Sequence, residues 1–103
     1  MSRKEEREKE RQSGTPRLRL RLYVAGDAPN SVEARANLEA ICRQALEPDA
    51  YDLEIIDVLE EPSRALEDGV LVTPTLMHAN SASASIIGTL EDHDRVKRAL
   101  GLA

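Results

Sequence analysis

The feature that most constrains this chain is a strand-like run that turns directly into a helix-like run. Over residues 17–24 polar and apolar residues alternate, which is the period of a β-strand with one apolar face. The apolar members are Leu18, Leu20, Leu22 and Val24. Gly26 and Pro29 then break the extended pattern, so we expect a loop before the next element.

A helix is predicted after this loop, ending near Leu46. Asn30 is placed to cap its first turn, and Glu33 follows three residues later, where a capping box puts a carboxylate. Apolar side chains recur at helical spacing and predict the buried face, which comprises Leu38, Ile41, Cys42, Ala45 and Leu46. Pro48 ends the helix, since it cannot continue helical geometry.

The loop between this strand and helix is the usual position for a ligand in a small α/β protein. Thioredoxin-like oxidoreductases carry a Cys-x-x-Cys pair there, because a helix N-terminus lowers the pKa of a thiol. In this chain residues 27–31 read Asp-Ala-Pro-Asn-Ser and contain no thiol. A thioredoxin-like reductase is therefore the least favoured function.

The remaining segments predict two more helices and three more strands. We expect strands at 51–59, at 70–72 and at 85–87, and a short helix at 63–67. Thr89 is placed to cap a last helix, with Asp92 as an imperfect capping-box partner. The predicted buried stripe of that helix is Val96, Ala99 and Leu100, and Gly101 ends it. The order β-α-β-α-β-β-α is the thioredoxin-like arrangement.

Four runs of this sequence, taken together, resemble the KaiB family. The first is the Leu-Tyr-Val-Ala-Gly of residues 22–26 with Pro-Asn-Ser at 29–31. The others are Ile-Ile-Asp-Val at 55–58, Val-Thr-Pro-Thr-Leu at 72–76 and Ile-Ile-Gly at 86–88, in the family's order and at about its spacing. The resemblance covers roughly residues 18 to 100.

The resemblance implies an α/β fold, either thioredoxin-like with a mixed four-stranded sheet or the family's ground-state fold, β-α-β-β-α-α-β. In the thioredoxin-like form the Thr73–Pro74 bond is expected to be cis, whereas the base rate for X-Pro bonds favours trans. Gly88 is a candidate position for switching between the two folds, because glycine leaves backbone options open. The segment before Ile86 is Ala/Ser-rich, where the family is often Pro-rich and basic, and the chain ends at Ala103 without a longer acidic tail. We therefore expect this homologue to rest in the thioredoxin-like form.

In function, the resemblance implies a non-enzymatic regulator that binds a KaiC-type hexameric ATPase and modulates its phosphorylation cycle, in circadian or stress-linked timing. The alternative is a non-rhythmic adaptor or sensor module in histidine-kinase signalling. Candidate partner-binding residues are Asp27 and Asn30 in the first loop, and Arg19 and Arg21 on the first strand. With Arg17, these two arginines form a basic stripe, which either contacts an acidic partner or simply faces solvent. In a central strand covered on both faces, they would need partners.

Composition limits the classes of partner and compartment. The net charge of −5 argues against nucleic acid, and the sequence shows neither a membrane span nor a signal peptide. A single cysteine, Cys42, fits a reducing compartment, so we expect a cytoplasmic protein. The core is aliphatic, with no Phe or Trp, and self-association would stabilise it, so a homo-oligomer stays open.

The sequence divides into an arm, residues 1–16, and one domain, residues 17–103. The arm carries five basic and four acidic residues without an apolar face, so we expect disorder, with a docking role as the alternative. No metal site is expected from the spacing of His78, His93 and Cys42. No phosphate loop or catalytic triad motif is present, and we predict no cofactor and no enzymatic activity.

Overall fold

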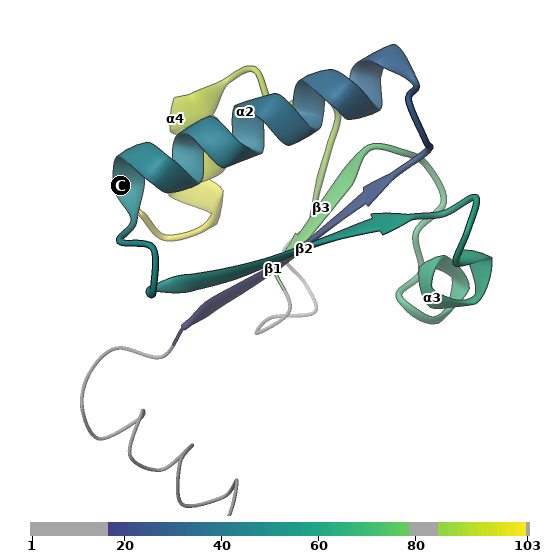
Figure 1. Ribbon diagram of the computed structural model, residues 1–103. Helices are drawn as coiled ribbons and strands as arrows, with labels where there is room; N and C mark the ends of the chain where they lie inside the picture. The colour runs from purple at the N-terminus through teal and green to yellow at the C-terminus, as the bar shows by residue number, and fades with distance from the viewer. Residues whose placement is uncertain (1–16, 79–84, 103) are drawn as a thin grey trace, which may run out of the picture.

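The computed structural model describes residues 17–78 and 85–102, and the predicted arm therefore lies outside the described residues. The elements follow the predicted order (Figure 1). Their bounds are β1 Leu18–Val24, α2 Pro29–Ala45, β2 Tyr51–Asp57, α3 Pro62–Glu67, β3 Thr75–His78, β4 Ser85–Ile87 and α4 His93–Ala99.

The four strands form one mixed sheet in the order β2-β1-β3-β4. The central strand β1 runs parallel to β2, with Leu18 opposite Tyr51 and Val24 opposite Asp57. It runs antiparallel to β3, which in turn pairs antiparallel with β4. The helix α2 connects β1 to β2, as the crossover between parallel strands requires. The predicted mixed four-stranded sheet is confirmed.

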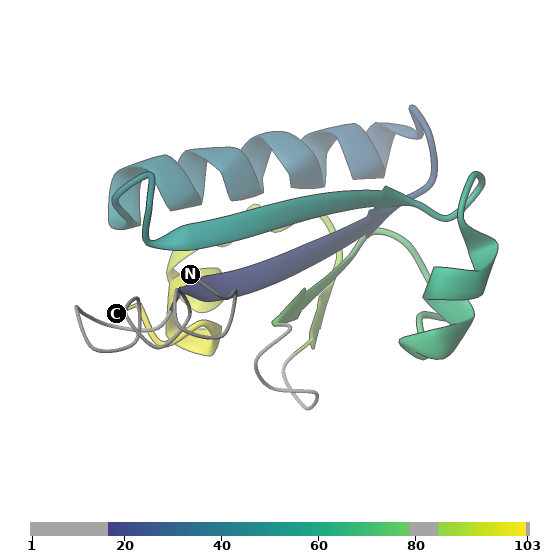
Figure 2. The same ribbon diagram turned by 60° about the horizontal axis from the view of Figure 1, so that its bottom comes forward.

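The two faces of the sheet are covered unequally. Helices α2 and α4 share a core with one face of β1, through its side chains Leu20, Leu22 and Val24. The other face carries a smaller cluster built on Tyr23, Ile56 and Ala65 under α3. Helix α3 lies at the end where β1 and β2 finish, and it is the one helix on this face within the described residues (Figures 1 and 2). We call this second face the open face.

Two strand predictions differ from the structure. Residues 70–72 were expected to form the third strand, but β3 begins only at Thr75. Pro74 has no N–H to donate to a ladder, so pairing starts after it, and Val70 instead donates its N–H to the carbonyl of Ala65 at 2.8 Å. The second strand ends at Asp57, two residues earlier than predicted, because the carboxylate of Asp57 is bound to the adjoining turn.

The N-cap residues predicted for α2 and α4 were both wrong. Helix α2 begins at Pro29 with Ala28 as its N-cap and no side-chain cap, so Asn30 lies inside the first turn. A proline suits that first position because its missing N–H would have no helical partner there. Helix α4 is capped by Asp92, whose side chain accepts a hydrogen bond from the N–H of Arg95 at 3.1 Å, and not by Thr89.

The buried faces of the helices are mostly those predicted. Leu38, Ile41 and Cys42 are fully buried on α2, and Val96 and Leu100 are buried at α4. Ala45 and Ala99 were predicted to be buried, but both are exposed. Each is the last residue of its helix, where helical spacing alone no longer determines which side chains face the core.

Candidate functional site

The loop that follows β1 is held in place by side chains from two other elements. Asp57, the last residue of β2, accepts hydrogen bonds at Oδ1 from the N–H of Gly26 at 3.1 Å and from that of Leu59 at 2.9 Å. Ser31, which is 2% exposed, accepts the N–H of Ala25 at 3.0 Å. The carboxyl ends of β1 and β2 are thus joined to the start of α2, and the loop has a defined shape.

Gly26 adopts a φ of 52°, the left-handed region that disfavours other residues. A Cβ at this position would lie 3.4 Å from Cδ1 of Leu59. The loop after β1 and the turn after β2 therefore touch at this point, which places the exposed side chain of Leu59 beside the loop.

The segment before β3 reaches the same end of the sheet. The Thr73–Pro74 peptide bond is cis, and Pro74 is buried. Because Thr75 pairs with Tyr23, this segment lies next to the end of β1. Its shape is fixed by two bonds: the Oγ1 of Thr75 donates to the carbonyl of Val72 at 2.7 Å, and the N–H of Gly88 donates to the carbonyl of Pro74 at 3.0 Å.

These segments expose four large apolar side chains at one end of the molecule. We call them the apolar end, and they are Val32 (54% exposed), Leu59 (72%), Leu71 (91%) and Val72 (48%). Figure 1 shows the segments that carry them at the arrowhead end of β1 and β2. Exposed carboxylates lie in the same segments, from Asp27, Glu33, Glu60 and Glu61. This end of the sheet therefore carries both exposed apolar side chains and carboxylates, a composition suited to contact with another protein.

The thiol of Cys42 is fully buried in the last turn of α2, and burial, assisted by the charge of Glu39, raises its pKa to about 11. A thiol in that state is a poor nucleophile. Within residues 17–78 and 85–102 there is no group of three or more His, Cys, Asp or Glu side chains that could hold a metal ion.

A charged network crosses the open face and attaches α3 to the sheet. Arg21 donates to Oδ2 of Asp68 at 3.0 Å, and the hydroxyl of Tyr23 donates to the same oxygen. Burial, followed by the bond to Asp68, raises the pKa of Tyr23 to about 12. The bond from Tyr23 and the charge of Arg21 hold the pKa of Asp68 below its ordinary value.

The second half of this network joins β2 to α3. Arg64 binds Glu54 with two hydrogen bonds, of 2.6 and 2.8 Å, and this fork lowers the pKa of the Glu54 carboxyl. Arg21 also approaches Glu54, at 3.7 Å. Of the two arginines on β1, Arg21 is thus paired with carboxylates and Arg19 is exposed to solvent, so neither is buried without compensation in this central strand. The sequence analysis did not identify Asp68 as a partner of Tyr23 and Arg21, because these residues lie 45 or more positions away from it in the chain and no local pattern encodes such a pairing.

The structure divides the predicted partner-binding residues into two groups. Asp27 and Asn30 are exposed in the loop after β1 and the first turn of α2, at the end of the sheet that carries the apolar end. Arg19 and Arg21 lie on the open face, where Arg19 is exposed and is paired in register with Asp52. The apolar members of the surface were not singled out from the sequence, because an exposed and a buried leucine look alike until the fold is known.

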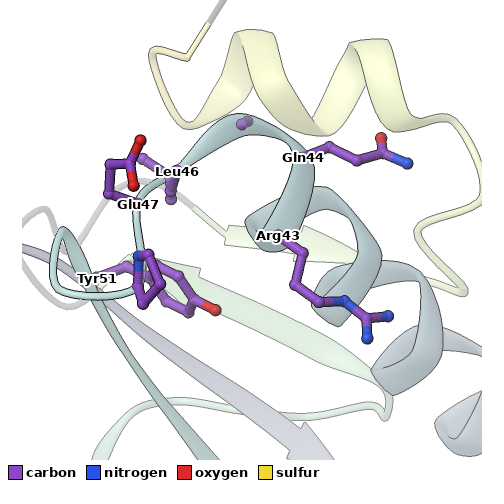
Figure 3. A pocket seen from close by; sticks show the side chains of 7 residues that line it. Arg43, Gln44, Leu46, Glu47 and Tyr51 are labelled. Atoms are coloured by element: carbon purple, nitrogen blue, oxygen red, sulfur yellow. The ribbon is translucent and has the colours of Figure 1, made fainter.

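A hollow lies at the opposite end of α2 (Figure 3). Its volume is about 310 Å³, and it is lined by residues 43–48 and by Tyr51. The side chains of Arg43 and Tyr51 border it from different elements (Figure 3). None of the predicted site residues lies there.

Comparison with known proteins identifies the family. Residues 21–102 match the sequence model of the KaiB domain. The chain is 46% identical over 84 residues to the circadian clock oscillator protein KaiB of Nostoc punctiforme, covering 81% of this chain and 80% of that protein. It is 43% identical over 81 residues to the circadian clock protein KaiB3 of Synechocystis, covering 78% of each.

Solved structures with the same arrangement are thioredoxins. Mitochondrial thioredoxin 3 of Saccharomyces cerevisiae gives a TM-score of 0.67 at 15% identity, covering 92% of this chain and 87% of that one. The germline-specific thioredoxin Deadhead of Drosophila melanogaster gives 0.65 at 16% identity, covering 95% and 91%. These likenesses concern the fold alone, and they confirm the predicted thioredoxin-like fold.

Among the described residues, no helix is long and apolar enough to cross a membrane. The family match extends from the middle of β1 to the last described residue, and therefore includes the whole apolar end. With relatives above 40% identity over most of its length, the chain belongs to the KaiB family.

Proposed function

We propose that this protein is a non-enzymatic regulator that binds a KaiC-type hexameric ATPase and modulates its phosphorylation and ATPase cycle. The resemblance to the KaiB family implies this role, and its relatives in Nostoc punctiforme and Synechocystis, which are circadian clock proteins, support a role in timing. The contact is assigned to the apolar end.

The observation that carries the proposal is the exposure of Leu59 and Leu71 on a structured surface. These side chains are 72% and 91% exposed, although the segments on either side of them are fixed by hydrogen bonds. Burying such a side chain completely contributes roughly 1.5–3 kcal/mol. Because the segments are already ordered, little conformational entropy is lost on binding. The apolar end is thus preorganised for a protein partner.

The predicted polar residues take different roles in this proposal. Asp27 and Asn30 border the apolar end and supply rim contacts, which set orientation and association rate more than affinity. Arg19 and Arg21 belong to the open face, and Arg21 already binds Asp68, so they form a second and weaker candidate contact.

Gly88 is proposed as the position at which the chain would switch to the other fold known in the family. Its φ of 117° belongs to a region that side chains rarely adopt, and it directly precedes the segment leading into α4. Amide NMR distinguishes the two states, because residues 93–99 are helical in the thioredoxin-like fold. Strand signals across residues 89–100 at equilibrium would contradict our expectation that this chain rests in the present fold.

The test is binding to a purified KaiC-type hexamer, by size exclusion with light scattering, under ATP and under ADP loading. We expect nucleotide-dependent co-elution of the wild-type chain. Leu59→Ser should weaken binding about tenfold, equivalent to about 1.4 kcal/mol, while changing the free energy of unfolding by no more than about 0.5 kcal/mol. The control is Gln44→Ser, because Gln44 is an exposed side chain near the opposite end of α2, away from the apolar end.

Equal weakening by Leu59→Ser and Gln44→Ser would contradict the assignment of the surface. No binding by the wild-type chain at high concentration would contradict the choice of partner. In that case the alternative of a KaiB-like adaptor or sensor module in histidine-kinase signalling becomes the better hypothesis.

A further inference from the structure

One polar side chain of α2 reaches across to the segment between β4 and α4. The amide nitrogen Nδ2 of Asn37 donates to the backbone carbonyl of Thr89 at 2.8 Å. Its oxygen Oδ1 lies 3.2 Å from Nε2 of His93, the first residue of α4. Among the described residues, these two are the side-chain hydrogen bonds that connect α2 to residues 88–102.

These two bonds define the orientation of the groups involved. Because the Asn37 amide nitrogen must face the Thr89 carbonyl, its oxygen faces the imidazole, and Nε2 of His93 must carry the hydrogen. The donor role of Nε2 is the same in the neutral Nε2–H tautomer and in the imidazolium. Asn37 therefore holds two points of the segment at once, one before and one at the start of α4.

The segment held by Asn37 contains two residues with positive φ, Gly88 at 117° and Leu90 at 61°. A glycine adopts such angles readily, so the unfavourable conformation is that of Leu90. The left-handed region is costly for a branched, non-glycine residue, and such conformations persist only where surrounding contacts impose them. The side chain of Leu90 is 5% exposed in the main core, and Thr89, immediately before it, is bound by Asn37. The burial of the Leu90 side chain and the hydrogen bond from the Asn37 amide to the Thr89 carbonyl together keep Leu90 in this conformation.

The same segment is linked to the apolar end. Gly88 precedes Thr89 and donates its N–H to the carbonyl of Pro74 at 3.0 Å. A short series of contacts therefore runs from Asn37 through Thr89 and Gly88 to the loop that carries Leu71 and Val72.

We propose that Asn37 is a latch: it holds residues 88–93 against α2, and its release frees β4 and α4 together while loosening the Pro74 loop. The inference does not depend on which partner the protein binds. It assigns to α2 a conformational role that is distinct from its contribution to the core, since Asn37 is half-buried at the edge of the buried face.

The experiment is hydrogen exchange, resolved by residue, on full-length Asn37→Ala and wild type at the same pH and temperature. We expect amides of residues 85–102 and the N–H of Gly88 to exchange at least tenfold faster in the variant. Amides of β1, β2 and the interior of α2 should exchange as in wild type. Gln44→Ala is the matched control, because Gln44 is an exposed amide side chain near the other end of the same helix. It should change neither region.

Two further variants separate a latch from a general packing defect. Asn37→Asp keeps the size of the side chain but loses the N–H donor to Thr89, so hydrogen exchange of the same amides should be faster. This variant replaces Asn37→Ala in the test if Asn37→Ala does not fold. His93→Ala leaves the Asn37–Thr89 bond intact and should accelerate exchange less than threefold. Nitrogen NMR of the imidazole should show Nε2–H in wild type and lose that preference in Asn37→Ala.

The proposal is overturned if Asn37→Ala accelerates exchange uniformly along the chain, or not at all. It is also overturned if His93→Ala matches Asn37→Ala, since the bond to Thr89 would then not be the restraint.

Discussion

The two halves of this domain are built from elements of very different size. The N-terminal half pairs two seven-residue strands in parallel and connects them with the 17-residue helix α2. The C-terminal half has strands of four and three residues and a seven-residue helix. Its connection to that helix contains two residues with positive φ. The comparison indicates that the first half forms the stable framework and that the second half opens at lower cost, because its strands and helix are shorter.

The largest effect should come from a cavity in the framework. Leu38→Ala removes a fully buried side chain of α2, and we expect a loss of about 3 kcal/mol in the free energy of unfolding by denaturant titration. Both halves should lose structure in one transition. Leu66→Ala, at a 76% exposed position, is the control and should change stability by no more than about 0.5 kcal/mol. Two separate transitions in Leu38→Ala would show that the halves fold independently.

A smaller effect is expected at the connection in the C-terminal half. Gly88→Ala places a Cβ at a φ of 117°, where no neighbouring atom obstructs it but the backbone conformation is unfavourable. We expect a destabilisation of about 1 kcal/mol, confined to residues 85–102 in hydrogen exchange. Gly69→Ala, at a φ of 71° in the turn after α3, is the matched control, and its effect should stay outside the C-terminal half. Equal exchange along the whole chain in Gly88→Ala would contradict the division into two halves.

The smallest effect concerns the charged network that attaches α3 to the framework. The hydrogen bonds from Arg64 lower the pKa of the Glu54 carboxyl from its ordinary value of 4.5. The hydrogen bonds from Tyr23 and Arg21 lower the pKa of the Asp68 carboxyl from its ordinary value of 3.8. A carboxyl with a lowered folded pKa stabilises the fold above its unfolded pKa, and this stabilisation is lost as pH falls through the folded value. The Tm of wild type should therefore decline from about pH 4.5 downward.

Glu54→Gln should lower Tm slightly at pH 7 and make that acid decline shallower, as measured by thermal unfolding between pH 2.5 and 7. Glu47→Gln is the control, because the exposed Glu47 makes no ion pair within the described part of the chain. An unchanged acid profile in Glu54→Gln would show that the fork to Arg64 contributes nothing measurable, as is common for exposed ion pairs.

Much of the fold was predictable because its signals are local. The alternation of Leu18 to Val24 predicted β1 and its buried face, and the spacing of Leu38, Ile41 and Cys42 predicted the face of α2. The errors fall where a tertiary contact overrides a local preference. Asn30 and Thr89 are good capping residues by type, yet Pro29 starts α2, and Asn37 engages the carbonyl of Thr89 upstream of the true cap at Asp92.

The candidate site was predictable only in its position. The loop after β1 could be located from the break at Gly26 and Pro29. Asp27 lies in that loop, whereas Asn30 lies in the first turn of α2. The exposure of Leu59 and Leu71 could not be predicted, since both belong to apolar runs that resemble strand interiors. Only the ending of β2 at Asp57 and the late start of β3 after Pro74 leave them outside the sheet.

By itself, then, the sequence determined the element order, the main core face and the family, because period, turn residues and motif order are all read along the chain. The tertiary structure decided which side of the sheet stays open, which carboxylates pair with Arg21 and Arg64, and how Asn37 holds the connection to α4. Those features join residues 10 to 56 positions apart. Their free energies depend on distance and burial in the folded chain, which no local pattern records.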